Sequence, residues 1–307
     1  KLPGEFKVNA VGYSQMQATE FYPWQYIVEP HRTTYIEMKG CVAKNTGGIF
    51  WEITYKPDAD PSLDAQVLLP RRPGGCDLLV NFTKVSQIYD VAVEVHGMDG
   101  DGGSHASATY RAPMMCKYVR REIRDLTDAD RRRYLEGMEQ ISMLPLADGQ
   151  ALYGNKFINL ESFAVKHIHT QECSPFHGGL SFITSHAAFT LELEQALQAI
   201  DPSITQPYWD YTLDYFMLGH EWDQSIVFDR DWYGSTDSGV TSTDEHIVAS
   251  SYFDHVPVPT NFSRPVHNSW GRVTSTINND PSMYVTRAHQ VCGFPINLPL
   301  PGCAELI

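Results

Sequence analysis

The chain has 307 residues, and its 37 Asp and Glu against 23 Lys and Arg give a formal net charge of −14. This length exceeds one typical domain and can bury a sizeable core, so two domains are expected. The acidic balance argues against nucleic acid and anionic membranes as partners. No apolar run approaches the ~18 residues of a membrane-spanning helix, so no membrane span is expected.

Residues 1–116 have the pattern of short β-strands. Proline and glycine clusters, among them the one at 70–75, are expected to interrupt these strands. Strands of this length and spacing predict an antiparallel β-sandwich. The module carries no catalytic signature, so its expected partners are other copies of the chain or other extracellular proteins. The clearest strand-like runs, rich in β-branched and aromatic residues, are 34–39, 50–55 and 89–95.

Six cysteines and two N-glycosylation sequons, at Asn81 and Asn261, are typical of a secreted, extracellular or lumenal glycoprotein. The alternative is a cytosolic protein with buried free thiols. We expect the disulfides Cys292–Cys303 and Cys41–Cys76, which leaves Cys116–Cys173 by elimination.

The pattern changes after Cys116, so residues 117–307 are expected to form a second, mainly helical domain with a loop-rich C-terminal part. The whole chain is therefore predicted to be α+β. Thr127, with Asp130 three residues later, predicts a helix N-cap. The apolar stripe of that helix is Tyr134, Leu135, Met138 and Ile141.

A charged segment comes before this helix. Three arginines, Arg120, Arg121 and Arg124, alternate with Glu122 and Asp125. Because both signs are interleaved, the segment is predicted to be a mixed, solvated surface and not a basic binding patch.

Three of the twelve histidines, His167, His177 and His186, have the spacing of metal ligands. His167 follows Phe163 by four residues, and His186 precedes Phe189 by three, so each is expected on the inward face of a helix. His177 is about two and a half helical turns before His186, so it is placed in the connection. Neutral imidazoles suit copper, zinc or iron. The alternative is three buried, hydrogen-bonded core histidines.

The stretch from His177 to Thr212 resembles the first copper half of tyrosinases and molluscan hemocyanins. It shares the eight-residue gap between His177 and His186, and then LEQAL at 193–197, DPS at 201–203 and PYWDYT at 207–212. The segment 118–138 also resembles the entry helix of tyrosinase domains, which lengthens the resemblance to about residues 118–212. The resemblance implies a tyrosinase-like helical domain and one copper on His167, His177 and His186. It departs from the family at Ser185 and Ala187, where a Trp and an Arg are usual.

The resemblance does not extend to a second copper site. The family's second trio includes a His-x-x-x-His pair, and no two of the five histidines in 213–307 are four apart. The segment 284–293 resembles tyrosinase-like proteins of algae and oomycetes, in which a second copper half follows. At most one copper per chain is expected here, and the second half is either lost or lies beyond Ile307.

Two further residues are expected to support the site. Glu194 is expected to reach the histidines as a hydrogen-bond acceptor, and Asp210 to cap a helix or pair with an arginine. Two functions stay open. One is oxidation of phenols or catechols with oxygen, if a second copper half exists, with a phenolic small molecule as partner. The other is a non-catalytic secreted structural or assembly glycoprotein with a degenerate tyrosinase-like domain. No catalytic residue is assigned.

Overall fold

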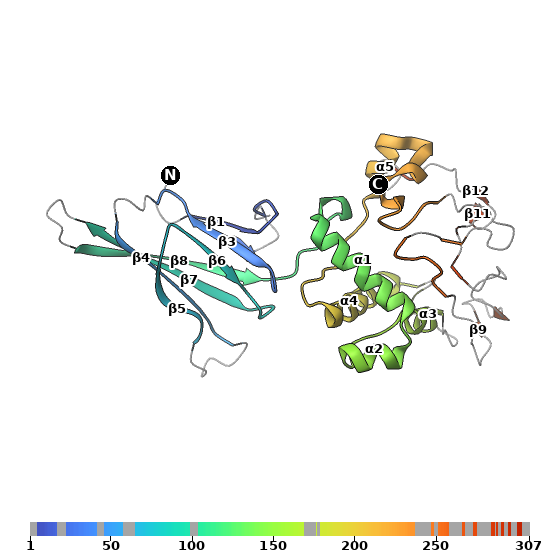
Figure 1. The fold of residues 1–307 in the computed structure, drawn as a ribbon, viewed down its shortest axis with the longest axis horizontal. Coiled ribbons are helices and arrows are strands. Elements are labelled where there is room, and N and C mark those ends of the chain that lie inside the picture. The colour runs from blue at the N-terminus through green and yellow to red at the C-terminus, as the bar shows by residue number, and fades with distance from the viewer. Residues whose placement is uncertain are drawn as a thin grey trace. The chain divides into compact units, whose positions relative to one another are not determined.

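The chain forms two compact units, Lys1–Val119 and Arg120–Ile307, which are described separately here. The first contains β-sheets and the second contains helices, which confirms the α+β class (Figure 1). The sequence placed the boundary a few residues earlier, at Cys116. The computed structural model describes residues 5–16, 23–41, 46–57, 65–98, 104–168, 176, 179–236, 247–248, 251–257, 266–267, 273–274, 284–285, 287, 290–291, 294–295 and 300–302.

The first unit has a three-stranded sheet of order β1-β3-β6 and a five-stranded sheet of order β2-β8-β7-β4-β5. Buried and exposed side chains alternate along β1 and β3, as expected for strands with one face on a core. Phe6 and Ile36 of the first sheet share one buried cluster with Trp51 and Val91 of the second. The strands are β1 (Phe6–Ala10), β2 (Tyr26–Val28), β3 (Thr33–Met38), β4 (Thr46–Tyr55), β5 (Gln66–Gly74), β6 (Asp77–Asn81), β7 (Ile88–Met98) and β8 (Ser104–Cys116).

Two features of these sheets differ from the prediction. Strand β2 pairs with β8 in parallel, so the larger sheet is mixed and not purely antiparallel. Strand β5 runs through the cluster at 70–75, which was expected to break strands. Proline is tolerated there because β5 lies at the edge of its sheet, where a missing N–H costs no ladder bond. The register also shifts between Trp51 and Ile53 of the neighbouring strand, opposite Pro70.

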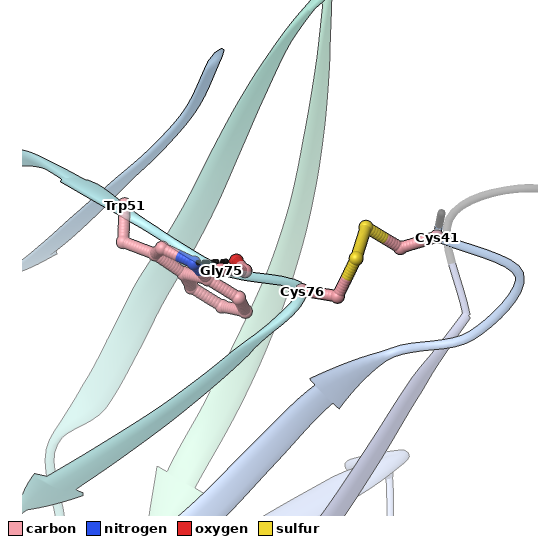
Figure 2. The surroundings of a disulfide bond; sticks show 4 residues. All are labelled: Cys41, Trp51, Gly75 and Cys76. Carbon is pink, nitrogen blue, oxygen red and sulfur yellow. Dashed lines mark hydrogen bonds between the residues drawn. A yellow bond between two sulfur atoms is a disulfide. The ribbon is translucent and has the colours of Figure 1, made fainter. Parts of the chain in front are cut away.

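The disulfide Cys41–Cys76 forms as predicted, and it links the segment after β3 to the start of β6 (Figure 2). Its sequence separation of 35 makes it worth on the order of 3–4 kcal/mol through the loop that it closes in the unfolded chain. Next to it, the indole Nε1 of Trp51 donates a 2.9 Å hydrogen bond to the carbonyl of Gly75. The disulfide and the buried indole therefore fix the same turn.

Cys116, the last residue of β8, has a free thiol and is buried. The pairing with Cys173 expected by elimination is therefore wrong. Cys173, Cys292 and Cys303 lie outside the described residues, so the pair Cys292–Cys303 stays a prediction. Burial, with a smaller contribution from the charge of Glu29, raises the pKa of the Cys116 thiol to about 12.

Alkylation of Cys116 by iodoacetamide at pH 9 is expected to be on the order of 10³-fold slower in the folded chain than in urea, because only the thiolate reacts. The folded pKa lies above the unfolded value of about 8.5. The neutral thiol therefore contributes stability that is complete below pH ~8.5 and is lost as the pH rises towards 12. Mass spectrometry of the Cys116 peptide follows the modification, and rapid native labelling would contradict the burial.

Asn81 ends β6, and its side chain is exposed, as is that of Thr83. Phe82 between them is fully buried. The sequon therefore presents its acceptor to solvent at the edge of the three-stranded sheet. Glycosylation at Asn81 stays a prediction, and Asn261 lies outside the described residues.

The second unit is built on helix α1, which packs against α3 and α4. The Oγ1 of Thr127 accepts a 3.2 Å hydrogen bond from the backbone N–H of Asp130, which confirms the predicted N-cap. Tyr134, Leu135 and Ile141 are buried in the core of the unit. The helices are α1 (Asp128–Met143), α2 (Leu146–Tyr153), α3 (Leu160–Ile168), α4 (Phe182–Ile200) and α5 (Tyr211–Leu218).

Short elements complete the second unit. They are the 3-10 segments Ile123–Asp125, Gly219–Gln224 and Ile226–Phe228, and the two-stranded pairs β9 (Val266–His267) with β10 (Val273–Thr274) and β11 (Gln290–Val291) with β12 (Phe294–Pro295). Within the described parts of both units, no helix is long and apolar enough to span a membrane.

Candidate metal centre

Helix α3 positions His167 through a buried anchor at its start. The side chain of Asn159 accepts a 3.0 Å hydrogen bond from the backbone N–H of Ser162 and donates to the carbonyl of Leu144. One turn later, Phe163 is buried against the core. His167 follows Phe163 by one more turn on the same face, so the anchor fixes the direction of its imidazole.

His186 lies in the second turn of α4, and its ring packs beside that of His167. The two ring centroids are 5.6 Å apart and the rings are inclined at 73°. Phe189, one turn further along α4, packs against His167 at 5.8 Å and against Phe163 at 5.2 Å. The structure thus brings two of the three predicted ligands together from different helices.

His177, the third predicted ligand, lies outside the described residues. The residue directly before it, Phe176, is buried, and its ring centroid is 5.2 Å from that of His167 and 5.6 Å from that of His186. The connection between α3 and α4 therefore contacts both described histidines at this point.

The tautomer of His186 follows from its backbone contact. Its Nδ1 lies 2.8 Å from the carbonyl oxygen of Phe182, and a carbonyl can only accept. Nδ1 must therefore carry the proton, which puts the ring lone pair on Nε2. Histidines that bind metals commonly donate their other N–H to a backbone carbonyl in this way, which orients the ring.

These two histidines fit a shared metal ion. An ion about 2 Å from one nitrogen of each ring places the ring centroids roughly 5–6 Å apart, and the observed 5.6 Å falls in this range. Within the described residues, no group of three His, Cys, Asp or Glu gathers to hold a metal. A third ligand, such as the predicted His177, would therefore have to come from outside these residues. Both histidines, which were predicted to face inward, are half-buried.

Residues 157–292 match the family model "Common central domain of tyrosinase". This chain carries a tyrosinase-type domain. The matched range contains all three predicted ligands and continues beyond Thr212, where the resemblance to the first copper half ended.

Curated relatives agree with this match. A tyrosinase-like protein of Caenorhabditis elegans is 25% identical over 193 residues, which cover 61% of this chain and 25% of the relative. The tyrosinase of Streptomyces antibioticus is 31% identical over 96 residues, or 31% of this chain and 33% of the relative. A tyrosinase-like protein of Diaporthe leptostromiformis is 30% identical over 135 residues, which cover 42% of this chain and 33% of the relative. The chain thus spans about a quarter to a third of the length of these relatives.

Glu194 of the tyrosinase-type domain does not play the role expected from the sequence. It is buried on α4, where its Oε2 accepts from Nε of Arg120 at 3.0 Å and also from Nη2. Its Oε1 accepts from the backbone N–H of Gln206 at 3.1 Å. Both oxygens are thus engaged away from the histidines, so Glu194 fastens α4 to its flanking segments.

The arginine-rich segment also differs from its prediction. Arg124 donates to Glu122 at 2.8 Å and to Asp214 at 2.9 Å, and the side chains of both carboxylates are at most 5% exposed. Asp214 also accepts a 2.6 Å hydrogen bond from the indole of Trp209. This buried ion network, Glu122–Arg124–Asp214, replaces the predicted solvated surface. Alternating charge signs in the sequence could not reveal the distant partner on α5.

Asp210 caps α5, as expected for a structural carboxylate. Its Oδ1 accepts from the backbone N–H of Thr212 at 3.1 Å, and its carbonyl accepts from Nη2 of Arg124 at 2.9 Å. The Pro-Tyr-Trp-Asp block of the tyrosinase-type domain therefore supplies hydrogen-bond partners to the buried ion network, through Trp209 and Asp210. None of its described hydrogen bonds joins Asp210 to His167 or His186.

A cavity of about 680 Å³ lies beside α1 and is lined by residues of α1 and of the segments 230–232 and 251–252. Its lining is rich in ionic side chains, and Arg131 lies over the ring of Trp232 at 4.1 Å. No histidine lines this cavity, so it is separate from the candidate metal centre.

Proposed function

We propose that this chain is a copper protein of the tyrosinase type in which His167, His177 and His186 hold one copper ion. The observation that carries the proposal is the adjacent pair His167 and His186, whose ring centroids are 5.6 Å apart, together with the Nδ1 contact of His186 that leaves its Nε2 available. The family match supports copper as the ion, since copper is what the resemblance implies at these positions. Imidazole nitrogen is also a ligand type that copper accepts well.

We propose further that the domain takes part in oxidation of phenols or catechols with oxygen. Bound copper would supply one-electron redox chemistry at this place. The residues of the chain supply the surroundings: Phe182 fixes the ring of His186 through its carbonyl, and Phe176 and Phe189 shield one side of the pair from water.

The purified chain, loaded with copper and dialysed, is expected to retain one copper per chain by elemental analysis. The variant His186→Ala is expected to lose it, with an affinity lower by at least ~100-fold, because it removes one of three ligands. The matched control His220→Ala, at an exposed histidine outside the centre, is expected to keep its copper. Two coppers per chain, or unchanged binding in His186→Ala, would contradict the proposal.

A phenol-oxidation assay on the same samples separates the two functions left open by the sequence. Oxygen uptake with a catechol that depends on His186 supports the oxidase. Copper binding without oxygen uptake assigns the chain to a non-catalytic role in an extracellular structure or assembly. We place the protein outside the cytosol, because disulfides such as Cys41–Cys76 persist in oxidising compartments.

A further inference from the structure

The outer face of the three-stranded sheet carries an exposed apolar side chain next to a glycosylation sequon. Along β6, Leu78 and Val80 pack into the core cluster, so Leu79 and Asn81 lie on the opposite, outer face. Leu79 is 57% exposed. The asparagine of the sequon and the exposed leucine are therefore neighbours on one face of one strand.

The strand register extends this face onto β3. Tyr35 pairs with Leu79, and Thr33 pairs with Asn81. Both residues of β3 lie on the outer face, since the buried positions of that strand alternate with them. Directly opposite residues in an antiparallel pair have Cβ atoms about 5 Å apart. Leu79 and Tyr35 are therefore adjacent, and together they are called the outer patch below.

The outer patch borders an edge of its sheet, because β6 is the last strand in the order β1-β3-β6. Edge strands can pair with other chains, and natural proteins cover or block them. The disulfide Cys41–Cys76 holds the chain next to the start of β6 (Figure 2), and the sequon at Asn81 lies at its other end. A group attached to Asn81 would thus cover the end of the edge strand that the disulfide does not hold.

We propose that Asn81 carries an N-linked glycan whose first N-acetylglucosamine packs on the outer patch and covers this edge of the sheet. One face of the sugar ring carries mainly C–H groups, which suit contact with Leu79 and the ring of Tyr35. Residues two apart on a strand are about 7 Å apart, a distance that a sugar ring on the asparagine amide can span. The inference does not depend on the metal centre, so either proposal can fail without the other.

The test uses the whole chain, secreted from yeast and trimmed with endoglycosidase H, which leaves a single N-acetylglucosamine on each occupied asparagine. Mass spectrometry of the Asn81 peptide is expected to show the sugar. Hydrogen exchange is then measured on the peptide that covers β3, which contains no sequon. This exchange is expected to be about 5-fold slower in the trimmed wild type than in Asn81→Gln, because covering the outer patch stabilises the sheet. Thr83→Ala, which removes the sequon but keeps Asn81, is expected to exchange like Asn81→Gln.

Leu79→Thr tests the contact itself, since threonine keeps the strand propensity but removes most of the apolar surface. In this background, Asn81→Gln is expected to change the exchange of β3 by less than ~2-fold. The matched control Ile88→Thr replaces an apolar residue of similar exposure, 46%, on the five-stranded sheet, and the effect of the sugar is expected to persist there. An unoccupied Asn81, equal exchange with and without the sugar, or a sugar effect that survives in Leu79→Thr would each overturn the proposal.

Discussion

Replacing Arg124 with methionine is expected to destabilise the second unit by about 3–5 kcal/mol, because it leaves two buried carboxylates without their counter-ion. The side chain of Glu122 is 5% exposed and that of Asp214 is 1% exposed. Burial alone would lower the pKa of Arg124, but hydrogen bonds and the charges of Glu122 and Asp214 outweigh it, and the pKa is raised. The arginine therefore stays charged, and urea denaturation followed by tryptophan fluorescence measures the loss.

Arg133→Met is the matched control for this prediction. Arg133 is half-exposed on α1, where it pairs with Asp130 at 3.3 Å and with Asp201 at 3.9 Å. Solvent screens such pairs, so this variant is expected to lose about 1 kcal/mol or less. Equal losses in Arg124→Met and Arg133→Met would show that burial of the network contributes nothing to stability.

Gly149→Ala is expected to cost about 3 kcal/mol of stability, although alanine is the better helix former by ~1 kcal/mol. A Cβ atom built on Gly149 of α2 would lie 1.9 Å from the ring of Phe157. Phe157 is fully buried and stacks on Tyr153 with ring centroids 5.7 Å apart. The ring has no exposed direction in which to retreat, so overpacking exceeds the gain in helix propensity.

A second substitution checks that the cost comes from this contact. The double variant Gly149→Ala, Phe157→Leu is expected to lose less free energy of unfolding than the two single variants lose together. The smaller side chain of leucine makes room for the methyl group of alanine. Additive losses would contradict the steric explanation. The exposed neighbour Asp148→Ala serves as a control for changes in α2 and is expected to stay within about 0.5 kcal/mol.

The secondary structure could be predicted where the local sequence pattern places apolar residues on the face that the folded chain buries. The strand runs at 34–39, 50–55 and 89–95 lie within β3, β4 and β7 or extend one of them by a residue, and the cap at Thr127 starts α1. The prediction that the proline and glycine cluster at 70–75 would interrupt a strand was wrong, because the position of β5 in the sheet outweighed the low strand propensity of these residues. Proline breaks a central strand but not an edge strand, and edge position is a property of the whole sheet. The parallel pairing of β2 with β8 is likewise set by contacts distant in sequence.

The candidate site shows the same limit. Helical periodicity placed His167 and His186 on α3 and α4, and the structure brings their rings together. Periodicity says which face a residue occupies, but not which distant group meets it. Glu194 was expected to reach the histidines, yet its carboxylate accepts a hydrogen bond from Arg120. The ion pair of Arg124 with Asp214 on α5 could not be predicted either, because the two residues are 90 positions apart in the sequence.

The buried thiol at the end of β8 bears on how the first unit acquires its disulfide. This unit has three cysteines, Cys41, Cys76 and Cys116, so two wrong pairs compete with the right one during oxidation. Disulfides reshuffle only when a thiolate attacks. Once β8 has joined its sheet, Cys116 is protonated and out of reach. Burial of Cys116 in the folded sheet therefore withholds from disulfide exchange the one free thiol among the three cysteines of this unit.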